Sequence, residues 1–147
     1  MVKIDVHLIF HIKSTSVQMH HGDLPRIFAY IGGILNGFGS IPLIVGGVCD
    51  HIHILTTLPK NQTIVALVRN TKSNSSRWIK TISPLYSSFA WQDGYGAFSV
   101  SPSLIEKTIN YIKNQEQHHH TMSFSDEYKA FLNAYKLQYD EQYLFND

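Results

Sequence analysis

Residues 41–59 hold the feature that most limits how this chain can fold. Two runs rich in β-branched and other apolar residues, at about 41–48 and 51–57, are separated only by Cys49 and Asp50. Two residues suffice to join antiparallel strands, whereas parallel strands need a crossover of a dozen residues or more. The segment therefore predicts a hairpin closed by a tight turn or bulge, and with it an antiparallel sheet.

The rest of the chain alternates strand-like and helix-like segments. Strand patterns occupy residues 2–12 and 95–100, and helical spacing of apolar residues covers about 24–38, 63–82, 103–118 and 124–137. Expected helix caps are Asp23, Asn61 or Thr63, Ser103 in a capping box with Glu106, and Ser123 or Ser125. The order β-α-β-β-α-β-α-α predicts one α+β domain over residues 1–147. We expect a ferredoxin-like antiparallel sheet with helices packed mainly on one face, plus C-terminal helices.

Composition narrows the class of protein. The 147 residues are 44% hydrophobic and only 16% charged, which is typical of a globular chain. The lone Cys49 excludes an internal disulfide and a cysteine-rich zinc module. No apolar run approaches the length of a membrane span, and Asp5 and His7 interrupt the apolar N-terminus. We expect a soluble protein of the cytoplasm.

The net charge of +1 conceals an uneven distribution. Residues 51–92 contain five basic side chains and no acidic one, while residues 114–147 contain six acidic side chains against two lysines. Such asymmetry favours a polyanionic partner, although a solvated basic helix face would give the same pattern. The basic side chains of the middle segment are Lys60, Arg69, Lys72, Arg77 and Lys80.

His51 and His53 are the first candidate site residues. Alternate residues of a strand share a face, so the two imidazoles become neighbours while Ile52 enters the core. Neutral imidazole is a common metal ligand, so the pair supplies half of a divalent-metal site; two polar residues on a half-exposed strand are the plain alternative. A histidine-triad hydrolase would need a third alternate histidine, but Leu55 stands there. The helical zincin pattern is also missing.

Tyr111 and Gln115 are the second candidate pair. Residues four apart share a helix face, and Ile105, Ile109 and Ile112 form a separate apolar stripe. A phenol beside an oxygen-donating amide can complete a mixed nitrogen and oxygen metal site next to a nucleophile. An ordinary amphipathic helix with a tyrosine at the edge of its stripe is the alternative.

Taken together, these motifs resemble the single-tyrosine HUH transposases, which include the insertion-sequence two-hundred type and the REP-associated tyrosine transposases. In replication-initiator relatives a lysine typically follows the nucleophile by three residues, and Asn114 at that position favours the transposase branch. The resemblance extends over nearly the whole chain. Its matching segments are residues 7–10, 50–54, 91–92, 94–101, 111–115, 131–132 and 139–145.

The resemblance implies roles for these residues. Tyr111 would be the nucleophile, and His51, His53 and Gln115 would hold one divalent ion, Mg²⁺ or Mn²⁺. Asp50 adjoins these ligands in the sequence, but a regular strand would point it away from the histidine pair, and a turn cap suits it better than a metal contact. The histidines at 118–120 are either a solvated cluster or a further contact to DNA or the ion.

The implied activity is metal-dependent cleavage and rejoining of single-stranded DNA at hairpin-containing element ends, through a 5′-phosphotyrosine. Alternatives are a domesticated hairpin nickase, a DNA-binding protein of the same fold without catalysis, and a small-molecule metalloenzyme. A homodimer is implied, with active sites that two subunits can share. We expect the basic residues Arg69, Lys72, Arg77 and Lys80 to contact DNA phosphates. Candidate stacking surfaces for bases are Trp78, Tyr86, Phe89 and Trp91, with core packing favoured for Trp78 because it lies on the apolar side of its helix.

Overall fold

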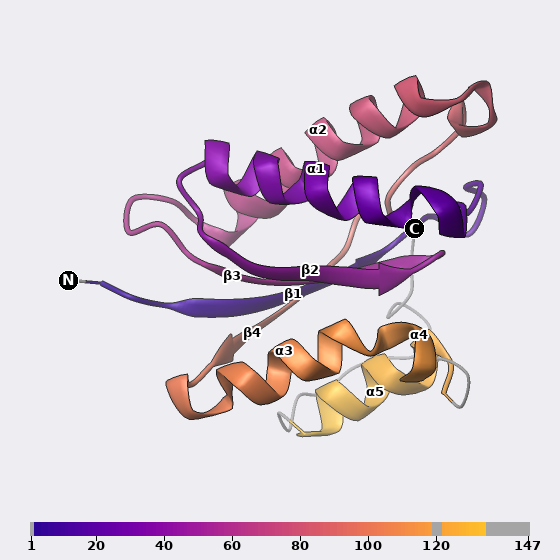
Figure 1. The fold of residues 1–147 in the computed structure, drawn as a ribbon. Helices are drawn as coiled ribbons and strands as arrows, with labels where there is room; N and C mark the ends of the chain where they lie inside the picture. The colour runs from indigo at the N-terminus through magenta and orange to yellow at the C-terminus, as the bar shows by residue number, and fades with distance from the viewer. Residues whose placement is uncertain (1, 119–121, 135–147) are drawn as a thin grey trace.

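The computed structural model describes residues 2–118 and 122–134. Four strands form one antiparallel sheet in the order β2-β3-β1-β4 (Figure 1). This is the predicted α+β arrangement, with β1 and β3 at the centre of the sheet. The strands are β1 (Asp5–His11), β2 (Pro42–Val48), β3 (His51–Thr57) and β4 (Gly96–Val100).

Helices cover both faces of this sheet. Helices α1 and α2 pack on one face, while the C-terminal helices α3, α4 and α5 lie on the opposite face (Figure 1). The long helices are α1 (Leu24–Gly37), α2 (Ile64–Ile82), α3 (Ile105–Lys113) and α5 (Phe124–Ala134), and α4 (Gln115–His118) is a single turn. None of the helices that the structure describes is long and apolar enough to cross a bilayer.

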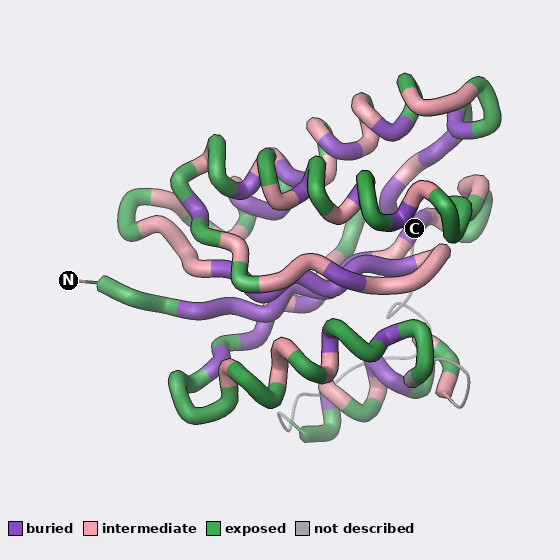
Figure 2. The backbone as a smooth tube through the Cα atoms, in the orientation of Figure 1, coloured by how far each residue is buried: buried purple, intermediate pink, exposed green. Residues whose placement is uncertain are grey.

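The two central strands are buried over nearly their whole length (Figure 2). Alternation along each strand divides their side chains between two layers. Leu8, Phe10, Ile52 and Ile54 join the main core beneath α1 and α2. The alternate residues, including Ile9 and Leu55, face the C-terminal helices in smaller apolar clusters. Polar residues along the middle of that second side of β1 and β3 are therefore buried, which sets the environment of the histidine pair.

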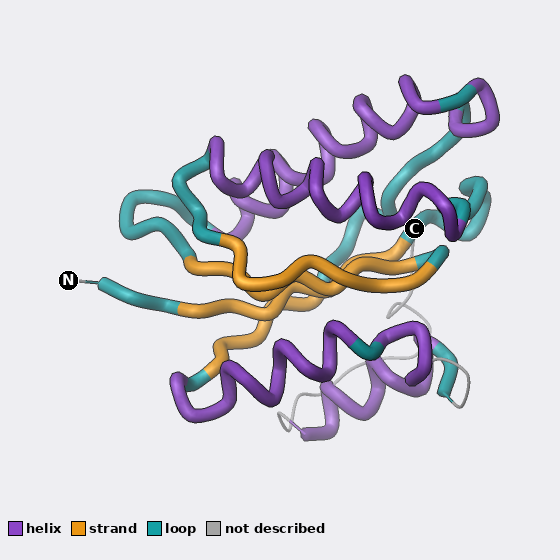
Figure 3. The backbone as a smooth tube through the Cα atoms, viewed as in Figure 1, coloured by secondary structure: helices purple, strands orange, loops and turns teal. Residues whose placement is uncertain are grey.

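The predicted hairpin is confirmed. Cys49 and Asp50 form the turn between β2 and β3, and Val48 pairs with His51. The longest connection runs from α2 back to β4 (Figure 3), and a bridge between Ile12 and Trp91 fixes its middle beside β1. Lys72 on α2 also holds this connection, through hydrogen bonds from its ammonium to backbone carbonyl oxygens.

Helix starts follow the sequence in part. Thr63 caps α2, since its hydroxyl accepts a hydrogen bond from the backbone N–H of Ala66 at 3.0 Å. Ser123 caps α5, since its hydroxyl accepts a hydrogen bond from the backbone N–H of Asp126 at 3.2 Å. Asp23 precedes α1, but its carboxylate bonds to Arg26 and Tyr86 and makes no side-chain cap. The predicted end of the last helix beyond residue 134, together with residues 119–120 and 139–145, lies outside the described residues.

Candidate metal centre and nucleophile

His51 and His53 lie side by side on the face of β3 that the C-terminal helices cover. Both side chains are fully buried, and Ile52 enters the main core on the opposite side as predicted. Gly46 on β2 pairs with His53, and a Cβ there would lie 2.9 Å from the side chain and the carbonyl oxygen of Ile112 on α3. The glycine therefore allows α3 to approach this part of the sheet closely.

The helix expected over residues 103–118 is interrupted, and its start is different. A 3-10 turn over Pro102–Leu104 precedes α3, which has no side-chain cap, so the predicted capping box of Ser103 and Glu106 is wrong. The helical path breaks at Asn114 and continues as α4. Despite the break, the Gln115 amide remains 3.4 Å from the carbonyl oxygen of Tyr111, so the two residues stay together.

Gln115 connects this helix to the histidine pair. Its side chain is buried, and its Oε1 lies 3.1 Å from Nε2 of His51. Its Nε2 donates a hydrogen bond to Oε2 of Glu127 at 3.1 Å, which fixes the amide with its oxygen toward His51. The structure thus brings the predicted ligands His51, His53 and Gln115 into one cluster.

Glu127 on α5 is a central member of this cluster that the sequence interpretation missed. Its Oε1 lies 3.0 Å from Nε2 of His53 and 3.6 Å from Nε2 of His51, and the side chain is buried. One signal was present in the sequence. Glu127 stands within the apolar stripe of its helix, among Phe124, Tyr128 and Phe131, where an acid without a partner would be costly.

Tyr111 completes the cluster. Its half-buried phenol donates a hydrogen bond to Oε2 of Glu127, and its ring lies 5.8 Å from that of His53. Burial, together with the hydrogen bond to Glu127, raises the pKa of Tyr111 well above its ordinary value. Burial alone would also raise the pKa of Glu127, but hydrogen bonds and charge from His53, with further bonds from Tyr111 and Gln115, lower it below its usual range. The pair is therefore a neutral phenol facing a carboxylate.

The donor set fits a divalent cation. One ligand atom each from His51, His53 and Glu127 lie within 4.8 Å of one another, and Gln115 adds an amide oxygen. Metal–ligand bonds of about 2.0–2.2 Å place neighbouring ligand atoms roughly 3 Å apart, close to the 3.0–3.6 Å separations between these side chains. Two imidazoles with carboxylate and amide oxygens suit a borderline or hard ion such as Mn²⁺ or Mg²⁺.

The far nitrogen of each imidazole also has a partner. Asp50 Oδ1 lies 2.7 Å from Nδ1 of His51, so Asp50 adjoins the centre from behind and does not face Glu127. His7 on β1 is buried, and its Nε2 lies 2.8 Å from Nδ1 of His53. Burial, reinforced by His53, lowers the pKa of His7 to about 3, so its imidazole is neutral at physiological pH. The sequence interpretation had given His7 no role in the site.

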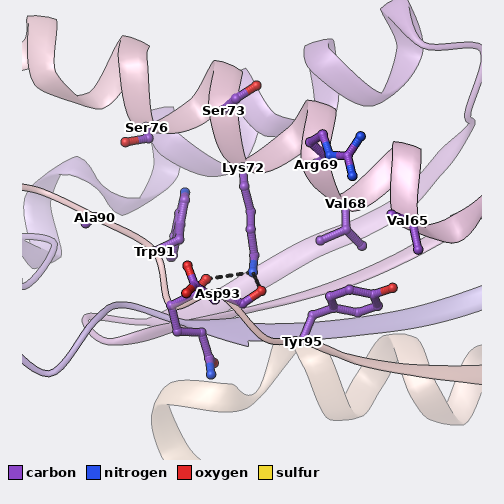
Figure 4. A pocket seen from close by; sticks show the side chains of 11 residues that line it. Val65, Val68, Arg69, Lys72, Ser73, Ser76, Ala90, Trp91, Asp93 and Tyr95 are labelled. Atoms are coloured by element: carbon purple, nitrogen blue, oxygen red, sulfur yellow. Dashed lines mark hydrogen bonds between the residues drawn. The ribbon is translucent and has the colours of Figure 1, made fainter. Parts of the chain in front are cut away.

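The basic residues of α2 lie on the other side of the sheet from this cluster (Figure 1). Arg69, Arg77 and Lys80 are exposed, but Lys72 is half-buried in a cleft of about 450 Å³ between α2 and the connection to β4. Its ammonium donates to the carbonyl oxygens of residues 92–94 at 2.7–3.3 Å. Figure 4 shows Lys72 extending toward this connection. Burial lowers its pKa to about 8, so it remains charged at neutral pH. Lys72 thus has a structural task that the other three basic residues lack.

The aromatic residues proposed as stacking surfaces for bases are also mostly structural. Tyr86, Phe89 and Trp91 are buried in the main core. Trp78 is half-buried and stacks on Tyr30 of α1, with ring centroids 4.1 Å apart. Tyr86, Phe89 and Trp91 therefore pack the core and are not available to stack on bases.

Comparison with known proteins identifies the family. The family model described as "Transposase IS200 like" matches residues 1–115. This range contains His51, His53, Tyr111 and Gln115, and ends before Glu127. No curated protein matches the chain.

Two solved structures share the fold. A protein of Deinococcus radiodurans R1, provisionally described as a transposase, is 20% identical with a TM-score of 0.61, and the match covers 78% of this chain and 92% of that one. A REP-associated tyrosine transposase bound to a REP hairpin is 12% identical with a TM-score of 0.61, covering 80% of this chain and 70% of that one. At such identities the likeness supports the α+β fold alone.

Proposed function

The chain belongs to the family of IS200-like transposases, and on this premise we propose that it is a metal-dependent transposase of single-stranded DNA. It cleaves and rejoins DNA at hairpin-containing element ends through a 5′-phosphotyrosine on Tyr111. The observation that carries the proposal is the joint position of a phenol, a buried carboxylate, an amide and two imidazoles in one cluster.

His51, His53, Gln115 and Glu127 would hold the ion, Mg²⁺ or Mn²⁺. When bound, a divalent cation acts as a Lewis acid toward a phosphate oxygen and offsets the charge that develops during displacement. The two oxygens of Glu127 have different neighbours, since Oε1 faces both histidines and Oε2 faces Tyr111 and Gln115. Glu127 can therefore serve the ion with one oxygen and the nucleophile with the other.

The displacement follows from this arrangement. Tyr111 Oη attacks the scissile phosphorus. As the new bond to phosphorus forms, the phenol proton becomes acidic and passes to Oε2 of Glu127, which already accepts the phenol hydrogen bond. The bond from phosphorus to the 3′ oxygen breaks, and that oxygen takes up a proton from solvent water to leave as a 3′-hydroxyl. The 5′ phosphate is then esterified to Tyr111. Attack by a 3′-hydroxyl on this ester reverses the step and joins DNA without ATP.

One chain carries one tyrosine and one metal cluster at this site. Two element ends therefore require two sites, which supports a homodimer, and we propose that this homodimer acts on DNA in the cytoplasm. Tyr111 lies beside the histidine pair of its own chain, so a site formed within one subunit is compatible with this arrangement. Sharing of α3 between subunits is a further proposal, which an obligate heterodimer of Tyr111→Phe and His51→Ala chains would test. One complete site forms in this heterodimer if α3 is exchanged between the subunits, and none forms if each subunit keeps its own α3.

The function is tested with an end-labelled single-stranded hairpin and Mg²⁺ or Mn²⁺, followed by denaturation and a search for a covalent protein–DNA adduct. We expect an adduct with the wild-type protein, none with Tyr111→Phe, and none with a chelator. His51→Ala should abolish cleavage while largely sparing hairpin binding. Tyr95→Phe, which removes a phenol away from the cluster, is the matched control.

Each contrary result has a distinct meaning. An adduct that persists in Tyr111→Phe would rule out this nucleophile. Cleavage without rejoining to a supplied 3′-hydroxyl would favour the hairpin nickase, and binding without any cleavage would favour a DNA-binding protein that has lost catalysis.

A further inference from the structure

Both imidazoles of the cluster are held from two sides. Their Nε2 atoms face Gln115 and Glu127, while their Nδ1 atoms contact Asp50 and His7 at 2.7 and 2.8 Å. The hydrogen bond that one ring nitrogen makes decides which nitrogen carries the proton and which has a free lone pair. The partners at Nδ1 therefore control how Nε2 is presented to an ion.

The two partners differ in what they can do. The Asp50 carboxylate can only accept a hydrogen bond, so it always favours a proton on Nδ1 of His51. A neutral imidazole such as His7 can either donate or accept through the same nitrogen, depending on where its own proton lies. His7 is thus the partner that can adapt when the proton on His53 moves.

His53 has to change its proton arrangement when an ion binds. Without an ion, Nε2 of His53 faces the Glu127 carboxylate at 3.0 Å and needs a proton there to donate. An ion at this position requires the lone pair of Nε2, which places the proton of the neutral ring on Nδ1. In the contact with His7, His53 would then be the donor and His7 the acceptor.

The surroundings suit an imidazole and not a second carboxylate at position 7. His7 is 3% exposed and its ring lies against Phe131, with centroids 5.4 Å apart, and against Phe98 at 6.5 Å. An acid enclosed by these rings would add a second buried negative charge close to Glu127, which is costly. A neutral side chain that both donates and accepts avoids that cost.

We propose that His7 is a positioning residue for the metal centre: it keeps the His53 ring oriented with Nε2 toward Glu127 and, once an ion is bound, accepts the hydrogen bond from Nδ1 of His53. This inference rests on the proposed function, because it concerns the ion of the same site. His7 would not itself contact the ion or the DNA.

The test measures Mn²⁺ binding to the intact protein by calorimetry, together with the proton position on His53. Loss of such an outer partner typically weakens metal binding about 10–100-fold, and we expect this for His7→Ala. His7→Gln, which retains a donor and an acceptor, should recover most of the affinity, and His20→Ala, an exposed histidine, should bind as wild type. In the Mg²⁺-loaded wild-type protein, ¹⁵N NMR of the imidazoles should find the His53 proton on Nδ1.

Unchanged Mn²⁺ affinity in His7→Ala would overturn the inference, as would His7→Gln binding as weakly as His7→Ala. A His53 proton on Nε2 in the Mg²⁺-loaded wild type would also overturn it, and this measurement needs no variant to fold. If the wild type bound Mn²⁺ and cleaved DNA in any of these cases, the proposed function would stand. A wild type that took up no Mn²⁺ would instead remove the proposed function and this inference together.

Discussion

The phenol of Tyr111 donates a hydrogen bond to the carboxylate of Glu127, sixteen residues later in the chain and on a different helix. Because Glu127 also contacts both histidines of β3, this one carboxylate joins the proposed nucleophile to the proposed metal ligands. The position of α5 on the sheet therefore matters for chemistry as well as for packing.

The acid stability of the metal-free protein should depend on Glu127. Its pKa is lower in the folded chain than the ordinary value of 4.5, so the unfolded chain takes up this proton first as the pH falls. The stabilisation is thus fully present above about pH 4.5 and lost below it. In urea titrations with a chelator present, the gap in unfolding free energy between wild type and Glu127→Gln should narrow from pH 5 to pH 3. A gap that stayed constant would contradict the assigned direction, and Asp126→Asn, an exposed neighbour, should show no comparable narrowing.

Substitution of Gly46 should displace α3. In Gly46→Ala the new methyl group would lie 2.9 Å from Ile112, so the helix that carries Tyr111 must shift. Overpacking of this kind costs about 1–3 kcal/mol of unfolding free energy, and adduct formation should fall as well. Gly33→Ala is the matched control, because its methyl group meets nothing within 4 Å. In a helix, alanine raises the unfolding free energy by up to about 1 kcal/mol relative to glycine. Wild-type stability and adduct yield in Gly46→Ala would show that α3 is not held at this distance.

Lys72 should matter more for stability than the exposed basic residues of α2. Lys72→Met keeps an apolar chain but removes the ammonium that binds three consecutive carbonyl groups. Hydrogen bonds from a charged donor contribute about 1.5–3 kcal/mol, and we expect a loss of roughly that size in denaturant unfolding. Lys80→Met, at an exposed position, should change the unfolding free energy by less than about 0.5 kcal/mol. Equal effects of the two substitutions would argue against the anchoring role of Lys72.

Hairpin binding should be sensitive to salt through Arg77 and Lys80. Each phosphate contact that is removed lowers the slope of log K against log salt by about one. The double variant Arg77→Gln, Lys80→Gln should therefore reduce the slope by about two across roughly 50–200 mM salt, measured by fluorescence anisotropy with a labelled hairpin. Lys3→Gln, which removes one positive charge outside residues 51–92, is the control and should leave the slope unchanged. An unchanged slope would place the DNA elsewhere on the molecule.

Local patterns in the sequence determined much of this protein. The short gap at Cys49 and Asp50 predicted the hairpin, and the two-residue period of β3 predicted that His51 and His53 would share a face. Helical spacing likewise placed Gln115 with Tyr111. The charge distribution showed that basic side chains are concentrated in the middle of the chain. These features depend on residues close together in the chain, whose relative positions the backbone geometry of a strand or helix already fixes.

Only the tertiary structure decided which distant groups meet. His7 and His53 are separated by 46 positions, and His53 and Glu127 by 74, so no local period links them. Lys72 reaches the carbonyl groups of residues 92–94 only because the connection to β4 returns beside α2. Contacts of this kind follow from how the two faces of the sheet are covered. An acid within an apolar stripe and a histidine within a buried strand acquire their roles only when α5 and β1 are packed against β3.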